Sequence, residues 1–156
     1  MTFNLPFEYD GSVTRHFGPV WNGVEFGDDH LGIDWRRDEG EPVKCPADGT
    51  VSLITDNDDE AGFSIWIQHT PGVISVFAHL MERPLIGVGD FVVQDEVVGY
   101  VGGTGNSTDP HLHFETIVLG AHYNPVTVST KWDYYSSVDW DSTATDSEEM
   151  NASDNA

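Results

Sequence analysis

The feature of this sequence that most restricts its fold is a series of short apolar stretches, each bounded by glycine, proline, aspartate or asparagine. Valine, isoleucine, phenylalanine and tryptophan are frequent in them, and no window shows a sustained period of 3.6 residues, so the pattern predicts β-strands rather than helices. Between two of the stretches, the segment 69–72 ends in Pro71 and Gly72 and predicts a hairpin turn. We therefore expect an all-β domain with strands at 50–55, 63–68, 73–79, 97–101 and 111–118.

The length and the cysteine content permit one core without covalent cross-links. A chain of 156 residues is the size of one domain, and such a domain buries roughly two thirds of its unfolded surface. The single cysteine, Cys45, cannot form an internal disulfide, so the fold does not depend on an oxidising compartment. We expect Cys45 to be a small buried hydrophobe, because a nucleophilic thiol would need a basic partner.

The charge of the chain argues against two classes of partner. With 27 acidic and 6 basic residues the formal net charge is −21, which disfavours binding to nucleic acid or to an anionic membrane surface. Residues 1–10 have neither the basic nor the apolar region of a signal peptide, and no apolar run approaches the roughly 20 residues of a membrane span. We expect a soluble monomer without an export signal of its own.

The C-terminal segment differs in composition from the rest. Residues 136–156 contain six acidic residues, no lysine or arginine and few branched apolar side chains, which is typical of a segment that does not order itself. We therefore expect a folded domain over residues 1–135 and an acidic disordered tail over residues 136–156.

Histidines and one aspartate form the patterns that carry chemistry. His30 and Asp34 lie in the segment HLGID, His111 and His113 in HLH, and His79 lies alone between them. In an extended strand, positions two apart share one face about 6.6 Å apart, so His111 and His113 can reach one groove while the leucine between them points to the core. Because zinc needs ligand atoms about 2 Å away, the chain must bend between His30 and Asp34.

A site of two histidines and an aspartate is typical of catalytic zinc. Structural zinc sites fill all four positions, usually with thiolates, whereas a catalytic site keeps one position open. One carboxylate leaves the divalent ion net positive and therefore a Lewis acid. The two remaining histidines would transfer protons or stabilise an oxyanion. Spacing alone does not decide which of His111 and His113 binds the metal.

Several segments resemble one known family in sequence and in order. They are FGP at 17–19, HLGID at 30–34, EPVKCPADGTV at 41–51, AHL at 78–80, VGD at 88–90, GYVGGTGNSTDPHLHFE at 99–115 and NPV at 124–126. Together they resemble the lysostaphin-type zinc endopeptidases, which cleave peptide bonds in peptidoglycan. The resemblance covers residues 13–126, and the last long segment is its most specific part.

The resemblance implies a fold and a role for each site residue. It implies an antiparallel β-sheet groove with the site on its floor, one zinc ion per chain held by His30, Asp34 and His113, and His79 with His111 as the catalytic pair. Phe77, Asp95 and Asp109 stand where the family usually has tyrosine, glycine and glycine. None of these departures removes a ligand or a catalytic histidine, but Asp109 alters the charge beside His111.

The remaining candidates are assigned as follows. We expect His69 to be structural, His16 and His122 to lie outside the chemistry, and Glu115 to support the site or the fold rather than to act as a base, since no HExxH spacing is present. We expect Trp21, Trp35 and Trp66 to be aromatic residues of the core or of the groove rim. If any of them stacks on a sugar, Trp21 is the best candidate, because its loop is flanked by glycine and asparagine.

The sequence thus predicts a zinc metalloendopeptidase that hydrolyses peptide bonds in peptidoglycan cross-links. Without an export signal it would be a bacteriophage lysin, held in the host cytoplasm until lysis or carried on the virion. The alternative is a non-catalytic binding or regulatory module of the same fold.

Overall fold

The computed structural model describes residues 2–21 and 26–138, and only the backbone of residues 19–21 and 26–28. Strands are the main regular structure of the described chain. The strands are β1 (Val13–Arg15), β2 (Gly18–Trp21), β3 (Phe26–His30), β4 (Ile33–Arg36), β5 (Pro42–Lys44), β6 (Gly49–Asp58), β7 (Gly62–Thr70), β8 (Val73–Leu80), β9 (Phe91–Val92), β10 (Val97–Tyr100), β11 (His111–Val118) and β12 (Ala121–Tyr123), and the helices are α1 (Pro125–Thr130) and α2 (Trp132–Ser137).

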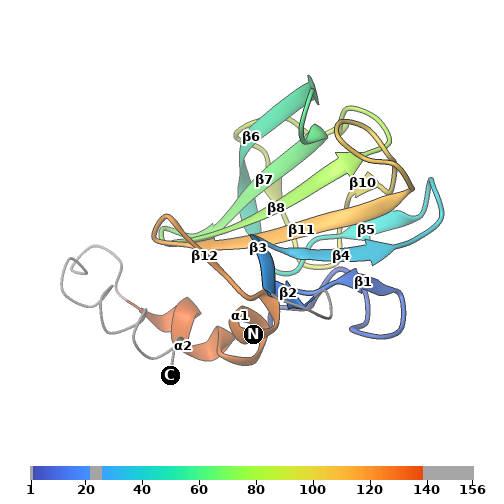
Figure 1. Ribbon diagram of the computed structural model, residues 1–156. Helices are drawn as coiled ribbons and strands as arrows, with labels where there is room; N and C mark the ends of the chain where they lie inside the picture. Colours follow the sequence, from blue (N-terminus) through green and yellow to red (C-terminus); the bar gives the residue numbers. More distant parts are fainter. Residues whose placement is uncertain (1, 22–25, 139–156) are drawn as a thin grey trace.

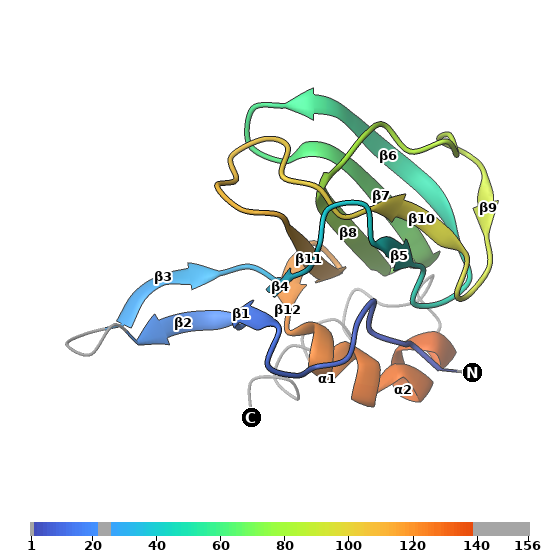
Figure 2. The ribbon, with the colours of Figure 1, turned by 90° about the vertical axis from the view of Figure 1, so that its right-hand side faces the viewer.

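One large antiparallel sheet forms the body of the molecule (Figure 1). Its strand order is β1-β4-β11-β8-β7-β6-β9, and β12 pairs with the end of β11. Two smaller sheets, β10-β5 and β2-β3, complete the fold, and the β2-β3 hairpin extends away from the body (Figure 2). The turn predicted at Pro71 and Gly72 joins β7 to β8. The predicted all-β, antiparallel class is therefore confirmed.

Strand β11 shows why the alternating pattern predicts the buried face correctly. Its even-numbered residues, among them Leu112 and Phe114, are fully buried, and its odd-numbered residues are partly exposed. Burying side chains of this size contributes about 1.5–3 kcal/mol each. Because successive side chains point to opposite faces, anchoring Leu112 and Phe114 in the core holds the histidines on either side of Leu112 on the opposite face of the sheet.

Two short helices follow β12, where no helix is predicted. Asn124 caps α1 by accepting a hydrogen bond from the backbone N–H of Val126, and Pro125 occupies its first turn. Each helix has six residues, fewer than two full turns, so the sequence holds too little of a 3.6-residue period to predict either one. Trp132 and Tyr135 of α2 are buried in the core, and the ring of Trp132 lies 5.0 Å from that of Phe3 near the N-terminus.

The end of α2 bears on the predicted domain boundary at residue 135. The helix continues to Ser137, and Val138 packs against the core. The remainder of the predicted tail, residues 139–156, lies outside the described residues.

Cys45 is an inert part of the core, as predicted. Its side chain is 1 % exposed and its Sγ donates to the carbonyl oxygen of Ala47 at 3.1 Å. Burial raises the pKa of the thiol to about 12, so the reactive thiolate is not formed at neutral pH.

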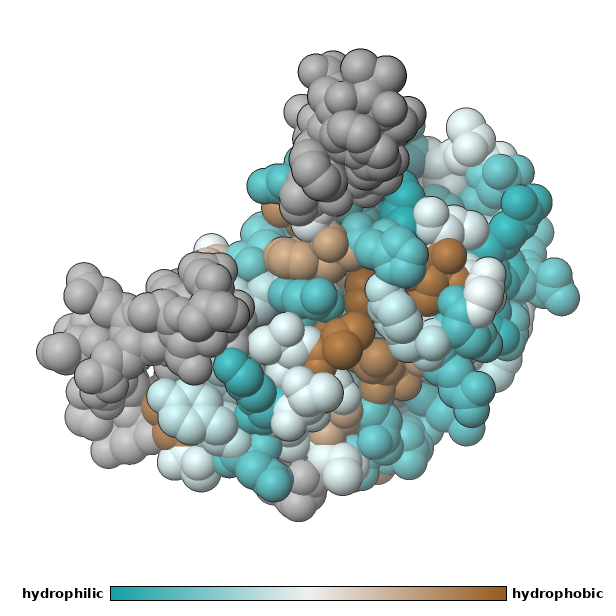
Figure 3. Space-filling model, turned by 60° about the horizontal axis from the view of Figure 1, so that its bottom comes forward, coloured by the Kyte–Doolittle hydropathy of each residue, from teal (hydrophilic) through white to brown (hydrophobic). Residues whose placement is uncertain are grey.

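The face shown in Figure 3 is largely hydrophilic, with apolar side chains gathered near its middle. Over the described part of the chain, neither helix has the length or the apolar character needed to cross a bilayer.

Gly32 lies where β3 gives way to β4, the place at which the sequence requires a bend. A Cβ atom on Gly32 would lie 2.3 Å from the backbone oxygen of Phe114 and 3.0 Å from Cγ of Glu115. The position therefore needs glycine because strand β11 approaches it closely, rather than because of a positive φ.

Replacing Gly32 by alanine should therefore destabilise the fold. We expect Gly32→Ala to lower the free energy of unfolding by about 2 kcal/mol or more, because the clash is with backbone that can yield only by moving β11. The exposed Gly11, at which an added Cβ meets no atom within 4 Å, is the control, and Gly11→Ala should change stability by less than about 0.5 kcal/mol. Urea unfolding of both variants measures the difference, and equal stabilities would contradict the packing described here.

Candidate metal centre and catalytic groove

Three side chains meet at the junction of β3, β4 and β11. His30 ends β3, Asp34 lies in β4, and His113 lies in β11 directly opposite Asp34 in the strand pairing. One ligand atom from each residue lies within 4.8 Å of the other two. The structure thus brings together the three residues that the resemblance implies as metal ligands.

The two histidines of this trio present different ring nitrogens to Asp34. Nδ1 of His30 donates to the backbone carbonyl oxygen of His16 at 3.1 Å, so its Nε2, 3.4 Å from Oδ1 of Asp34, is left for a metal. His113 has the opposite arrangement, with Nδ1 2.7 Å from the same oxygen and Nε2 3.3 Å from Oε1 of Glu115. Two imidazoles and one carboxylate, each oriented by a neighbour, fit a zinc site with an open position.

Electrostatics hold Asp34 in its charged form. Its burial alone would raise the pKa, but the hydrogen bond from His113 and the nearby ring of His30 hold the pKa of this carboxyl well below its usual range. Burial alone would lower the pKa of His113, yet its contacts with Asp34 and Glu115 raise that pKa to about 9. The metal-free site therefore contains an imidazolium between two carboxylates at neutral pH.

His79 lies beside this trio at an irregular point of β8. Phe63 pairs with Leu80 and Ile65 with Phe77, so β8 has one residue more than β7 between these pairs, which is a β-bulge. His79 lies in that bulge with a φ of 61°, and its Nδ1 donates to the carbonyl oxygen of Thr104 at 2.7 Å. Burial lowers the pKa of His79 despite this bond, so the ring is neutral at pH 7 with Nε2 unprotonated.

His111 completes the set of five predicted residues. Its Nδ1 donates to the backbone carbonyl oxygen of Asp109 at 2.9 Å, and its Nε2 is 3.9 Å from Oδ2 of Asp34. The rings of His79 and His111 are 4.8 Å apart between centroids. All five residues singled out in the sequence therefore face one space.

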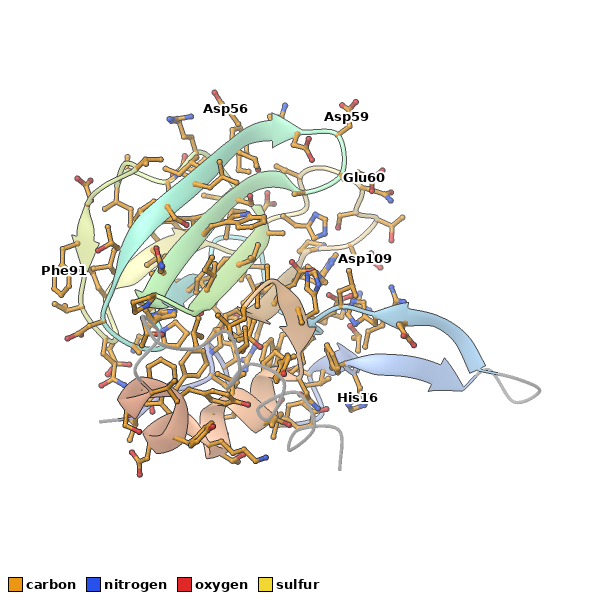
Figure 4. The ribbon with its side chains drawn as sticks, turned by 90° about the vertical axis from the view of Figure 1, so that its left-hand side faces the viewer. His16, Asp56, Asp59, Glu60, Phe91 and Asp109 are labelled. Carbon is orange, nitrogen blue, oxygen red and sulfur yellow. The ribbon has the colours of Figure 1, made fainter. Side chains whose placement is uncertain are left out.

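That space is an open groove of about 680 Å³. Strands β7, β8 and β11 form its floor, and the end of the β6-β7 hairpin and residues 106–108 form its rim. Figure 4 shows Glu60 at the hairpin end and Asp109 on the loop before β11, on the same side of the molecule. An open groove between two loops can accept an extended chain rather than a compact small molecule.

Two contacts at the site have no signal in the sequence. Nε2 of His122 is 3.5 Å from the carboxylate of Glu115, which is itself in contact with the metal-site ligand His113. The pairing of Ile117 with His122 turns His122 to the face of Glu115, and that pairing depends on a three-residue strand too short to predict. Thr104 holds His79 through its backbone, which no side-chain pattern reports.

The other histidines agree with their predicted places. His69 is structural, because its Nδ1 lies within hydrogen-bond distance of the carbonyl oxygens of Ala47 and Asp48 and its Nε2 is 2.6 Å from Oγ of Ser75. Burial lowers the pKa of His69 to about 4.

The ring of His16 contacts Tyr9, and only the backbone carbonyl of His16 reaches the site. The side chain of Trp21 lies outside the described residues.

Comparison with known proteins agrees with this geometry. Residues 28–125 match the model of Peptidase family M23. The chain is 37 % identical over 114 residues to the peptidoglycan DD-endopeptidase ShyC of Vibrio cholerae, and 39 % identical over 102 residues to the DD-carboxypeptidase/endopeptidase Mpg of Neisseria meningitidis. These matches cover 73 % and 64 % of this chain, but the chain spans only 25 % and 23 % of those relatives.

Solved structures of similar fold agree with the match to this family. A mutant catalytic domain of the prophage-encoded protein EnpA from Enterococcus faecalis matches with a TM-score of 0.69 and 28 % identity over 80 % of this chain and 95 % of that one. A zinc-containing peptidase from Vibrio cholerae matches with a TM-score of 0.70 and 27 % identity over 80 % of this chain and 39 % of that one. The catalytic domain of lysostaphin from Staphylococcus simulans matches with a TM-score of 0.65 and 27 % identity over 76 % and 91 %.

The raised pKa of His113 predicts how metal binding depends on pH. In the metal-free protein, Asp34 and Glu115 stabilise the protonated ring of His113. This contribution to the stability of the fold is complete below pH 6.5 and is lost as the pH rises through about 9. A metal must displace that proton. We therefore expect zinc affinity, measured by chelator competition, to increase about tenfold for each pH unit between 6.5 and 9.

Glu115→Gln is the matched variant for this experiment. It removes one of the two carboxylates that raise the pKa of His113, so the pH range of steep dependence should move to lower pH. If the zinc affinity of the native protein stays constant across this pH range, His113 does not carry the proton assigned to it.

Proposed function

Because the chain belongs to Peptidase family M23, we propose that it is a zinc metalloendopeptidase that hydrolyses peptide bonds in the cross-links of bacterial peptidoglycan. The observation that carries the proposal is the convergence of His30, Asp34 and His113 with two further histidines in one open groove. The names of the relatives support the substrate, since ShyC is a peptidoglycan DD-endopeptidase.

His30, Asp34 and His113 would hold the zinc ion. When bound, zinc would polarise the scissile carbonyl and lower the pKa of a water molecule. The trio supplies one negative charge and two neutral imidazoles, so the centre would keep a net positive charge. Glu115 would keep the ring of His113 in the orientation and tautomer that this requires.

His79 and His111 would move the protons. Since the Nδ1–H of His79 is engaged by Thr104, its free Nε2 is the atom that can accept a proton from the attacking water. His111 is oriented in the same way by Asp109, so its Nε2 also faces the groove. If protonated, His111 would stabilise the negative charge that develops on the carbonyl oxygen of the substrate and would then donate its proton to the leaving amine.

The groove also suits the substrate class. Its length between the β6-β7 hairpin and the loop before β11 admits an extended peptide, and its rim contains Asp58 and Glu60. Carboxylates on the rim disfavour polyanionic substrates, so we assign the peptide bridges of the wall rather than its anionic polymers.

We further propose that the protein is a phage lysin that works as a monomer, with the peptidase unit in residues 1–135. The similarity to a prophage-encoded catalytic domain over nearly its whole length supports this origin. Detection of the chain in mature particles would favour a virion-borne enzyme, and its restriction to lysing cells would favour release at lysis. A non-catalytic module is disfavoured because all five site residues are present and converge.

Substitution of single histidines separates the two proposed roles. His113→Ala should abolish stoichiometric zinc binding, because only two ligands remain. His79→Ala should retain zinc and lower kcat by about 10²–10⁴-fold, the range expected for a missing general base. Metal analysis and hydrolysis of purified walls measure both effects. Loss of zinc from His79→Ala would show that the roles are assigned wrongly.

The bond that is cut can be identified directly. We expect mass spectrometry of fragments released from walls of known cross-link type to show new peptide termini within the cross-links and intact glycan strands. Fragments with cleaved glycan and intact peptides would contradict the proposed substrate.

A further inference from the structure

The backbone of His79 is in a conformation that needs an explanation. A φ of 61° is in the left-handed region, which is uncommon for residues other than glycine and is found where the surroundings impose it, often at functional sites. The N–H of His79 donates to the carbonyl oxygen of Ala61 at 2.8 Å. That bond fixes the backbone of His79 against the turn before β7, but it does not orient the ring.

Thr104 makes three hydrogen bonds around this bulge. Its hydroxyl donates to the carbonyl oxygen of Leu80 at 2.6 Å and accepts from the N–H of Phe63 at 3.1 Å. Phe63 and Leu80 are partners across β7 and β8, so one hydroxyl bridges the two strands beside the bulge. The carbonyl oxygen of the same residue accepts from Nδ1 of His79 at 2.7 Å.

Two glycines allow the loop that contains Thr104 to lie this close to the sheet. A Cβ atom on Gly62 would be 2.2 Å from the hydroxyl oxygen of Thr104, and a Cβ atom on Gly105 would be 2.3 Å from the backbone nitrogen of Gly62. Both glycines also have positive φ angles, 67° and 75°. The loop is therefore closely packed on the start of β7, and the position of the Thr104 carbonyl is set by the hydroxyl that anchors it.

We propose that Thr104 is the positioning residue of His79. Its hydroxyl fixes the loop to β7 and β8, and its carbonyl thereby holds the Nδ1–H tautomer of His79 with Nε2 directed into the groove. Thr104 is neither among the residues that line the groove nor in the metal-binding trio, so it acts only through His79. The inference rests on the proposed function to the extent that it makes His79 the proton-transfer group.

The test compares a variant that keeps the hydroxyl with one that keeps the shape. Thr104→Ser retains the hydroxyl, and kcat should stay within about threefold of the native value. Thr104→Val keeps the volume but loses the hydroxyl, and kcat should fall by about 10-fold to 100-fold, because a displacement of about 1 Å can have effects of that size. The zinc affinity of both variants should stay within about twofold of native, since none of the three ligands contacts Thr104.

A spectroscopic measurement is independent of catalysis. The ¹⁵N chemical shifts of the His79 ring in the metal-free protein should report the Nδ1–H tautomer in the native chain and in Thr104→Ser, and a mixture of tautomers in Thr104→Val. If Thr104→Val does not fold, Thr104→Ala takes its place, with the same expected loss of kcat and the same mixture of His79 tautomers. An inactive native chain that still shows this tautomer pattern would reject the proposed function and leave the positioning role standing.

Two results would overturn the proposal. One is a folded Thr104→Val protein with native kcat and an unchanged His79 tautomer. The other is a parallel loss of zinc affinity and activity in Thr104→Val, because that would identify Thr104 as a general structural support of the groove rather than a residue acting on His79.

Discussion

The pairing of β11 between β4 and β8 is the constraint on which the rest of the site depends. Its register places His113 opposite Asp34 on one side and opposite Ala78, the neighbour of His79, on the other. Since side chains alternate along a strand, a shift of one residue would turn the histidines of β11 into the core and its leucine and phenylalanine into the groove. The buried side chains of Leu112 and Phe114 therefore set the positions of the chemical groups.

Around that strand, the four histidines of the site and Asp34 each have a defined polar partner. Asp34 is 8 % exposed, and a buried carboxylate is tolerated only where it is paired. Here the protonated ring of His113 compensates its charge without a metal, and a bound cation would take over that role. The same hydrogen bonds that satisfy the outer nitrogens of His30, His79 and His111 leave one nitrogen of each ring facing the groove.

Much of this could be predicted from local patterns. Alternation in 111–118 predicts that His111 and His113 share a face, and the bounded apolar stretches predict the antiparallel strands. The choice of His113 rather than His111 as the proposed ligand needed the family resemblance. The strand register supports that proposal, since His113 is the one that pairs with Asp34. A bend between His30 and Asp34 was expected from the ligand spacing, but the need for glycine at position 32 comes from the close approach of Phe114.

Other features depend on tertiary contacts that leave no local signal. The helices after Asn124 are stabilised by burying Trp132 against Phe3, near the opposite end of the chain. His122 reaches Glu115 through a strand of three residues, and the bulge at His79 arises from the pairing of β7 with β8. To predict any of these three features, one must know which segments of the chain contact one another. The secondary-structure propensities of the residues do not contain that information.

The most direct test of the account is the metal content of the purified chain, measured together with its action on peptidoglycan before chelation, after chelation and after zinc is restored. The account predicts one zinc ion per chain, hydrolysis of cross-links that disappears on chelation, and recovery when zinc is returned. A folded chain that binds no stoichiometric zinc and leaves walls intact under all three conditions would contradict it.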